Sequence, residues 1–160
     1  MLVPAILYKD EIIEKMQNYF YTDDMMYEVG ELDNQVPDIA DEPDRETFQY
    51  AIVDDKENLI GYLAYHVDWY ASCAYNFGLF SFDRGNILIG RDLFSKMEEL
   101  VHRFHRLEWR MFGGNPVEKS YDNFCKKHNG TKHILKDVTK DRDENYHDHV
   151  IYEIINEENK

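Results

Sequence analysis

Cysteine is scarce in this sequence, with only Cys73 and Cys125 among 160 residues. The two lie far apart and form no CxxC pair, which excludes a zinc ribbon. Isolated cysteines in a chain of this length favour reduced thiols over a disulfide framework. Each is therefore interpreted as a small buried apolar side chain, because free cysteine usually behaves in that way.

Long hydrophobic runs are absent as well. No stretch approaches the ~20 apolar residues that a membrane-spanning helix needs. Residues 1–10 contain no basic region followed by an apolar run, so no secretory signal is expected there. We therefore predict a soluble, cytoplasmic protein with no membrane partner.

Positive charge is in short supply. The 18 Lys and Arg are outnumbered by 32 Asp and Glu, which gives a formal net charge of −14. This balance argues against nucleic acid as a partner of the surface as a whole.

The charges are unevenly distributed along the chain. Residues 21–46 hold ten acids and one base, whereas residues 84–136 hold eleven Lys and Arg and six acids. A basic region in an acidic protein indicates a place for an anionic ligand, and an acidic region indicates a place for a cationic one. Ordinary solvated surface explains the same pattern equally well.

The apolar residues are sufficient for one folded domain over residues 1–160, since 43% of the chain is hydrophobic and 14% aromatic. Helical spacing predicts a helix capped by Asp10, a second from Ile87, and a third with Pro116 in its first turn and Gly130 at its left-handed C′ position. Residues 21–46 are predicted to form a loop. The predicted strands cover residues 3–7, 48–53, 59–67, 73–82, 107–111, 132–138 and 146–155. Gly78 inside the fourth of these indicates a bulge or a close backbone approach. The chain therefore belongs to the α+β class, with an antiparallel hairpin early and helical crossovers later.

Residues 77–94 (FGLFSFDRGNILIGRDLF) form a predicted strand, loop and helix. Exposed amides at a helix start, together with the helix dipole, favour bound anions. Gly85 and Gly90 allow close backbone approach, while Arg84 and Arg91 supply positive charge. Residues 107–124 (LEWRMFGGNPVEKSYDNF) form a second strand–turn–helix unit that contains Asn115.

These two units, in this order of elements, resemble the GNAT superfamily of acetyl-CoA-dependent N-acetyltransferases over roughly residues 3–155. The resemblance implies a mixed, mostly antiparallel central sheet of about seven strands flanked by helices. It implies acetyl-CoA as the acyl donor, and it implies splayed central strands that hold pantetheine. The residues it assigns to coenzyme binding are Leu79, Phe80, Ser81, Arg84, Gly85, Asn86, Gly90, Arg91, Asn115 and Phe124.

The first unit departs from the family pattern. The usual loop carries Gln or Arg, two residues, Gly, one residue, and Gly or Ala. Here Gly85 stands at the Gln or Arg position and Leu88 at the earlier glycine. The loop therefore has a shifted register or binds phosphate weakly.

The second unit leaves the general acid open. In the family, a tyrosine on this helix commonly protonates the departing thiolate. Counting from the helix end places that position at Phe124, and counting from Asn115 places it at Asp122, beside Tyr121. Tyr121 is the predicted acid, although a packed core aromatic explains it equally well.

A base must also take a proton from the attacking amine, either directly or through water. Glu108 is the predicted base, and His66 and Asp68 remain alternatives. The acidic segment falls where the family places its substrate loop, which suggests a cationic small molecule or peptide amine as acceptor. An inactive acyl-CoA-binding or regulatory module of the same fold is the alternative function.

A metal site is not predicted. His147 and His149 share a strand face, and His128 and His133 lie elsewhere, but there is no HExxH motif. Trp69 and Tyr70 are interpreted as surface aromatics that a homodimer contact would cover.

Overall fold

The computed structural model describes residues 1–19, 36–42, 44–141 and 143–159. Its strands form one seven-stranded sheet in the order β1-β2-β3-β4-β5-β7-β6. All neighbouring pairs are antiparallel except β4 and β5, which are parallel. The strands are β1 (Leu2–Pro4), β2 (Thr47–Val53), β3 (Leu59–Asp68), β4 (Cys73–Ser81), β5 (Arg106–Phe112), β6 (Thr131–Lys140) and β7 (Tyr146–Ile155). The predicted α+β class and mixed sheet are confirmed.

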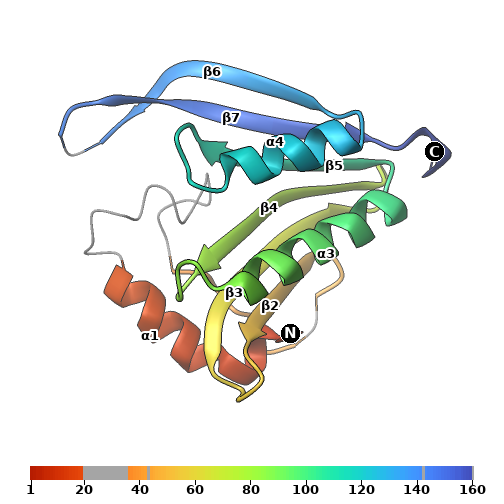
Figure 1. Cartoon of the computed structure of the whole chain (residues 1–160). Coiled ribbons are helices and arrows are strands. Elements are labelled where there is room, and N and C mark those ends of the chain that lie inside the picture. The colour runs from red at the N-terminus through yellow and green to blue at the C-terminus, as the bar shows by residue number, and fades with distance from the viewer. Residues whose placement is uncertain (20–35, 43, 142, 160) are drawn as a thin grey trace.

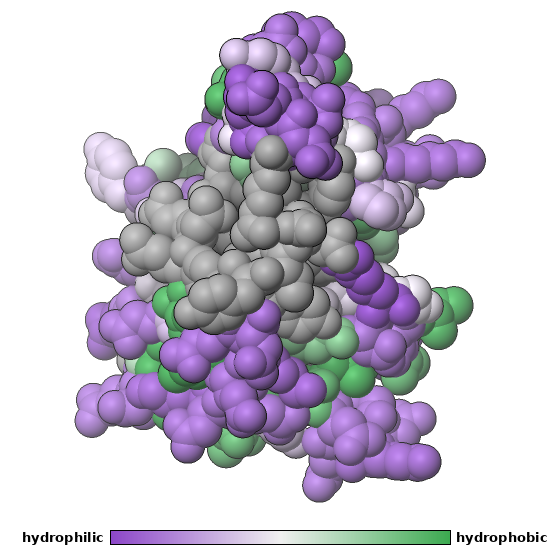
Figure 2. Space-filling model, turned by 90° about the vertical axis from the view of Figure 1, so that its left-hand side faces the viewer, coloured by the Kyte–Doolittle hydropathy of each residue, from purple (hydrophilic) through white to green (hydrophobic). Residues whose placement is uncertain are grey.

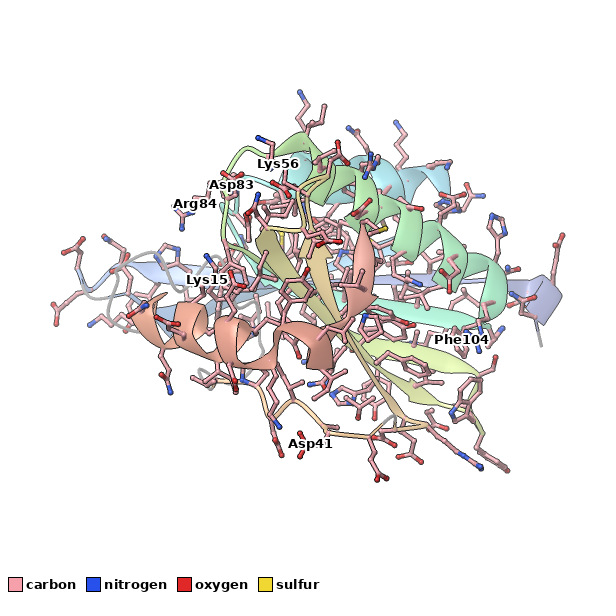
Figure 3. The ribbon with its side chains drawn as sticks, turned by 90° about the horizontal axis from the view of Figure 1, so that it is seen from below. Lys15, Asp41, Lys56, Asp83, Arg84 and Phe104 are labelled. Atoms are coloured by element: carbon pink, nitrogen blue, oxygen red, sulfur yellow. The ribbon has the colours of Figure 1, made fainter. Side chains whose placement is uncertain are left out.

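Three longer helices flank this sheet: α1 (Lys9–Tyr19), α3 (Ile87–Arg103) and α4 (Glu118–Lys127). In Figure 1, α3 and α4 lie across β4, β5 and β7, and the β6–β7 hairpin extends along the top. Figure 3 shows α1 on the opposite side of the strands from α3. Short 3-10 turns follow β1 (Ala5–Tyr8) and β7 (Glu157–Asn159).

Each face of the sheet has its own buried cluster. Under α3 and α4, the alternating residues Leu107, Trp109 and Met111 of β5 are at most 2% exposed. This alternation places every second side chain of a strand in the core. On the other face, Ile12 and Met16 of α1 pack in a separate cluster that includes Phe80 of β4.

The central strands separate part of the way along their length. The parallel β4–β5 pairing runs from Cys73 and Arg106 only as far as Phe77 and Trp109. Beyond this point, β4 stays paired with β3 up to Ser81, and β5 stays paired with β7 up to Phe112. The two halves of the sheet therefore diverge in a V between β4 and β5.

A β-bulge lies where the V begins. The register of β4 shifts between Ala74 and Phe77 against β5, and opposite Tyr65 against β3. Asn76 within it has φ 49°, a left-handed conformation that asparagine tolerates better than most residues. The sequence suggested a bulge at Gly78, and the structure places it two residues earlier.

Three predicted element boundaries are corrected. The first strand ends at Pro4, because the chain then turns into the 3-10 segment Ala5–Tyr8. Asp10 lies inside α1 rather than at its cap. Pro116 precedes α4, whose N-cap is Val117.

The end of α4 was predicted to use Gly130 in a left-handed conformation. Asn129 takes that conformation instead, with φ 54°. Gly130 is required for a different reason, because a Cβ atom there would lie 2.6 Å from the carbonyl oxygen of Glu153 and 2.8 Å from Cys125 Sγ. Its amide donates to the Cys125 carbonyl at 2.8 Å.

Replacing Gly130 with alanine is expected to destabilise the protein by about 1–3 kcal/mol, because α4 must shift away from β7. Gly90→Ala is the matched control, since a Cβ atom at Gly90 meets nothing within 4 Å. A helical glycine-to-alanine change there should stabilise by about 0.5–1 kcal/mol. Denaturant unfolding of both variants would contradict this account if their free energies of unfolding moved in the same direction.

The described part of the chain contains no helix that is both long enough and apolar enough to cross a membrane. Figure 2 shows a mainly hydrophilic surface around the residues drawn in grey, at the end where the β6–β7 hairpin projects. Cys125 is buried and Cys73 half-buried, and both are free thiols.

Candidate functional site

A pocket of about 400 Å³ lies where β4 and β5 separate. Its walls come from the end of β4, the loop before α3, the first turns of α3, the end of β5 and the start of α4. Phe77 and Met111 line it on the two diverging strands, and Leu93 and Phe94 line it on α3. The pocket therefore connects the helix start predicted to bind an anion with the helix that carries Tyr121.

The loop between β4 and α3 turns tightly at Gly85, which has φ 81°. Asn86 caps α3, because its side chain accepts a hydrogen bond from the Leu88 amide at 3.0 Å. Among the described residues, the amides of Gly85 and Ile87 have no hydrogen-bond partner. This geometry leaves donors at the positive end of a 17-residue helix, and of the two residues Gly85 lines the pocket.

The described lining of the pocket has basic side chains and no acidic ones, although Arg110 pairs with Glu108 outside the lining. This described lining includes Arg84 and Arg110 but no Asp, Glu or His. Figure 3 shows Arg84 beside Asp83 on this loop, at the far end of α3 from Phe104. In a chain with net charge −14, such a lining favours an anionic ligand.

Tyr121 lines the pocket from α4, next to Ser120. It is 6% exposed and lies among the rings of Phe94, Trp109 and Tyr152, at centroid distances of 5.8–5.9 Å. Burial raises the pKa of Tyr121, which keeps the phenol protonated. Its hydroxyl has no hydrogen-bond partner among the described residues, so its proton is available to a ligand.

The other two candidates for the acid position face elsewhere. Phe124 packs against Phe94, Trp109 and His128 in the core and does not line the pocket. Asp122 points toward the β6–β7 side, where it accepts hydrogen bonds from Tyr152 and Lys132. Neither of the positions that the two counts gave lines the pocket, whereas their neighbour Tyr121 does.

The structure brings together seven of the ten residues assigned to coenzyme binding. Phe80 points to the opposite face of the sheet, because strand side chains alternate. Its ring centroid lies 5.2 Å from that of Phe82. Arg91 is largely exposed and donates to Asp92 at 3.1 Å. Phe124 is the third residue outside the pocket. The seven that line it are Leu79, Ser81, Arg84, Gly85, Asn86, Gly90 and Asn115.

Glu108 lies on the face of β5 opposite α3 and α4 and is not itself among the described lining residues, although its partner Arg110 is. It accepts hydrogen bonds from Arg106 at 2.6 Å and from Arg110 at 3.0 Å. Arg106 also pairs with Glu153, at 3.1 Å. Both carboxylate oxygens of Glu108 are thus engaged by guanidinium groups.

The alternative bases are also held by neighbours. His66 Nδ1 lies 3.2 Å from the Thr47 hydroxyl, and its ring packs against Tyr75. Asp68 accepts from the Ala71 amide at 2.9 Å and so fixes the β3–β4 turn. The base for the amine stays a prediction.

Sequence reasoning missed several lining residues, and the polar ones among them are Asn76, Arg110 and Ser120. Arg110 was hidden because its strand reads only as apolar alternation. Its place just beyond the last β4–β5 pair, at Trp109, depends on the divergence of the strands. Ser120 precedes Tyr121 in the first turn of α4, where a short polar side chain suits a ligand; that position was a usable signal.

The histidines considered as metal ligands each have another contact. His128 lies 3.0 Å from Glu98, His133 lies 3.0 Å from Glu153, and His147 lies 2.8 Å from Asp141. His149 packs on Phe112. The described residues contain no group of three or more side chains suited to hold a metal ion.

The surface aromatics lie at the β3–β4 turn. Trp69 donates to the Arg45 carbonyl at 2.7 Å and packs against Phe104, while Tyr70 is fully exposed. The homodimer contact stays a prediction.

No family model matches the sequence, and no curated protein matches it at a significant level. Solved structures do match the fold. A protein provisionally named a phosphinothricin N-acetyltransferase has a TM-score of 0.68 at 14% identity, and the match covers 97% of each chain. The ribosomal-protein-S18-alanine N-acetyltransferase from Escherichia coli has a TM-score of 0.52 at 13% identity, over 71% of each chain.

The spermidine/spermine N-acetyltransferase of Vibrio cholerae has a TM-score of 0.56 at 14% identity, over 70% of this chain. The match spans 66% of that enzyme's own length. Identities at this level establish architecture only. The sheet order, the divergence of β4 and β5, and these similarities together show that the chain has the fold of the GNAT N-acetyltransferases.

Proposed function

We propose that this protein transfers an acetyl group from acetyl-CoA to a primary amine. The observation that supports this most directly is one pocket whose lining includes both the start of α3 with its loop and Tyr121. A phosphate-bearing thioester needs both features, a donor-rich cationic end for its diphosphate and a proton donor for its sulfur.

The residues present fit acetyl-CoA on chemical grounds. The amides of Gly85 and Ile87, with Arg84 beside them, would hold the pyrophosphate. The unpaired edges of β4 and β5 offer backbone donors and acceptors, of which those near Leu79 and Ser81 would hold pantetheine and polarise the acetyl carbonyl. Bound acetyl-CoA supplies the activated acyl group.

The chain's own residues would divide the proton transfers. Tyr121 would give its phenolic proton to the sulfur as the carbon–sulfur bond breaks and the amine nitrogen bonds to the carbonyl carbon. The described lining contains no carboxylate or imidazole, so the proton that the nitrogen loses would pass through water to a base outside that lining. We assign this step to Glu108, acting through water, with His66 and Asp68 as alternatives on β3.

The proposed acceptor is a cationic small molecule or peptide amine, because the segment 21–46 is strongly acidic. Residues 21–35 and 43 of that segment lie outside the described residues. Replacing Asp23, Asp24 and Glu28 by their amides is expected to raise KM for a cationic amine several-fold and to leave KM for acetyl-CoA unchanged. Initial rates with a series of amines test this role. If KM is unchanged for every accepted amine, the acidic segment does not recognise the acceptor.

The function is tested by thermal shift with acetyl-CoA, followed by an amine panel with thiol detection. The expected result is stabilisation by acetyl-CoA and release of CoA thiol with at least one amine. The engagement of Glu108 by two arginines favours a second candidate, a non-catalytic acyl-CoA-binding module of the same fold. Stabilisation without turnover would identify that module, and no stabilisation would remove both candidates.

A further inference from the structure

The side of α4 that faces away from the pocket is tied to three other elements by one polar cluster. Lys132 of β6 lies 2.8 Å from Glu118 and 2.8 Å from Asp122, both on α4. The Tyr152 hydroxyl of β7 donates to Asp122 at 2.7 Å. Glu118 also accepts from the amide of Gly114, in the turn before α4, at 2.9 Å.

The same tyrosine forms part of the wall around Tyr121. The Tyr152 ring is fully buried and stacks on Trp109 at 5.0 Å with an interplanar angle of 10°. Its centroid lies 5.9 Å from that of Tyr121. Tyr152 therefore touches the Tyr121 ring with its own ring and holds the next residue of the helix, Asp122, with its hydroxyl.

This arrangement fixes Tyr121 in two ways. Consecutive residues of a helix are rotated by about 100°, so anchoring Asp122 toward β7 sets the direction in which Tyr121 points. The wall of rings then restricts the Tyr121 side chain itself. A donor without a protein partner depends on such support, because nothing else in the described structure orients its hydroxyl.

The cluster is electrostatically consistent with a fixed geometry. Burial alone would raise the pKa of Asp122, but the hydrogen bonds from Lys132 and Tyr152 lower it overall. Burial and the hydrogen bond to Asp122 raise the pKa of Tyr152. At neutral pH, Asp122 is thus an ionised acceptor and Tyr152 a protonated donor, which is the stronger form of hydrogen bond.

We infer that Tyr152, Asp122 and Lys132 are positioning residues for catalysis, which hold α4 so that the Tyr121 hydroxyl meets the leaving sulfur. This inference rests on the proposed function, because it concerns the acid of that reaction. None of the three residues lines the pocket. They act through Tyr121 and not by contact with either substrate.

The test is a double-mutant cycle of Tyr152→Phe and Tyr121→Phe, with kcat and KM for acetyl-CoA measured for all four proteins. Tyr152→Phe keeps the stacked ring and removes only the hydroxyl. It is expected to lower kcat about tenfold in the wild-type background, with KM for acetyl-CoA changed less than twofold. In the Tyr121→Phe background the same change should alter kcat less than twofold, because the group being positioned is already absent.

Tyr65→Phe is the matched control. Tyr65 is also a buried strand tyrosine, 1% exposed, whose hydroxyl pairs with Tyr50 away from the pocket. It should lose comparable stability without a change in kcat. Asp122→Asn is the second variant, because it keeps an oxygen for the Tyr152 hydroxyl and loses only the charge that faces Lys132. It should give a smaller fall in kcat that also disappears in the Tyr121→Phe background.

Two results would overturn the inference while leaving the proposed function intact. One is an active wild type in which Tyr152→Phe and Asp122→Asn lower kcat by the same factor in both backgrounds, as a general structural loss would. The other is an active wild type in which neither variant changes kcat. A wild type that releases no thiol with any amine removes the proposed function and this inference with it.

Discussion

Tyr121→Phe is expected to lower kcat about 10²-fold while KM for acetyl-CoA stays within about threefold of its original value. Tyr121 lines the pocket and its hydroxyl has no hydrogen-bond partner among the described residues, so the change removes a proton donor and little else. A positioned general acid typically contributes ~10²–10⁴ in rate. The comparison requires steady-state kinetics of both proteins with one saturating amine.

Stability separates this chemical effect from a packing effect. The aromatic contacts with Phe94, Trp109 and Tyr152 survive in Tyr121→Phe. Because the lost hydroxyl made no hydrogen bond to the described protein, Tm should stay the same or rise slightly. A kcat within twofold of wild type would remove Tyr121 from the mechanism.

The pH dependence of the same reaction offers an independent check. An ordinary tyrosine stays protonated up to about pH 10. Because burial raises the pKa of Tyr121, its phenol stays protonated over at least that range. The kcat of the wild type should therefore show no alkaline fall due to this group below pH 10. Any fall on the acidic side belongs to the base that accepts the amine proton.

The sheet was well predicted because its strands carry strong local signals. Residues 146–155 form β7 with the predicted bounds, since Val150, Tyr152 and Ile154 alternate with polar residues. The order of helices and strands followed from the same periodicities. The first strand was overextended, because an apolar run such as Val3–Leu7 does not show where the backbone turns.

The site was harder to predict than the fold. Gly85, Asn86 and Asn115 were found because turn and cap chemistry marks them in the sequence. The directions of the Tyr121, Asp122 and Phe124 side chains were ambiguous. A helical wheel shows which residues share a face of the helix, but not which other element packs against that face. Asp122 is drawn away by Tyr152, 30 residues distant in the chain, and no local pattern contains that contact.

Placing a carboxylate at position 90 should weaken coenzyme binding about 10²-fold without harming the fold. Gly90 lines the pocket near the start of α3, and a side chain there meets no atom within 4 Å of its Cβ. Gly90→Glu would put a negative charge beside the proposed pyrophosphate site. At ~6 Å and an effective dielectric constant of about 20, one pair of like charges repels by ~3 kcal/mol, which is about 10² in affinity.

Gly90→Gln is the control, because it has the same shape and no charge. Calorimetric titration with acetyl-CoA should give a dissociation constant about 10²-fold weaker for Gly90→Glu than for Gly90→Gln. Without ligand, the acidic variant should be the more stable of the two by about 0.3–1 kcal/mol, because an acid near a helix start interacts well with the dipole. The two effects oppose each other, so general damage to the fold cannot imitate them. Equal affinities for the two variants would place the diphosphate elsewhere and remove the main support for an acetyl-CoA site at α3.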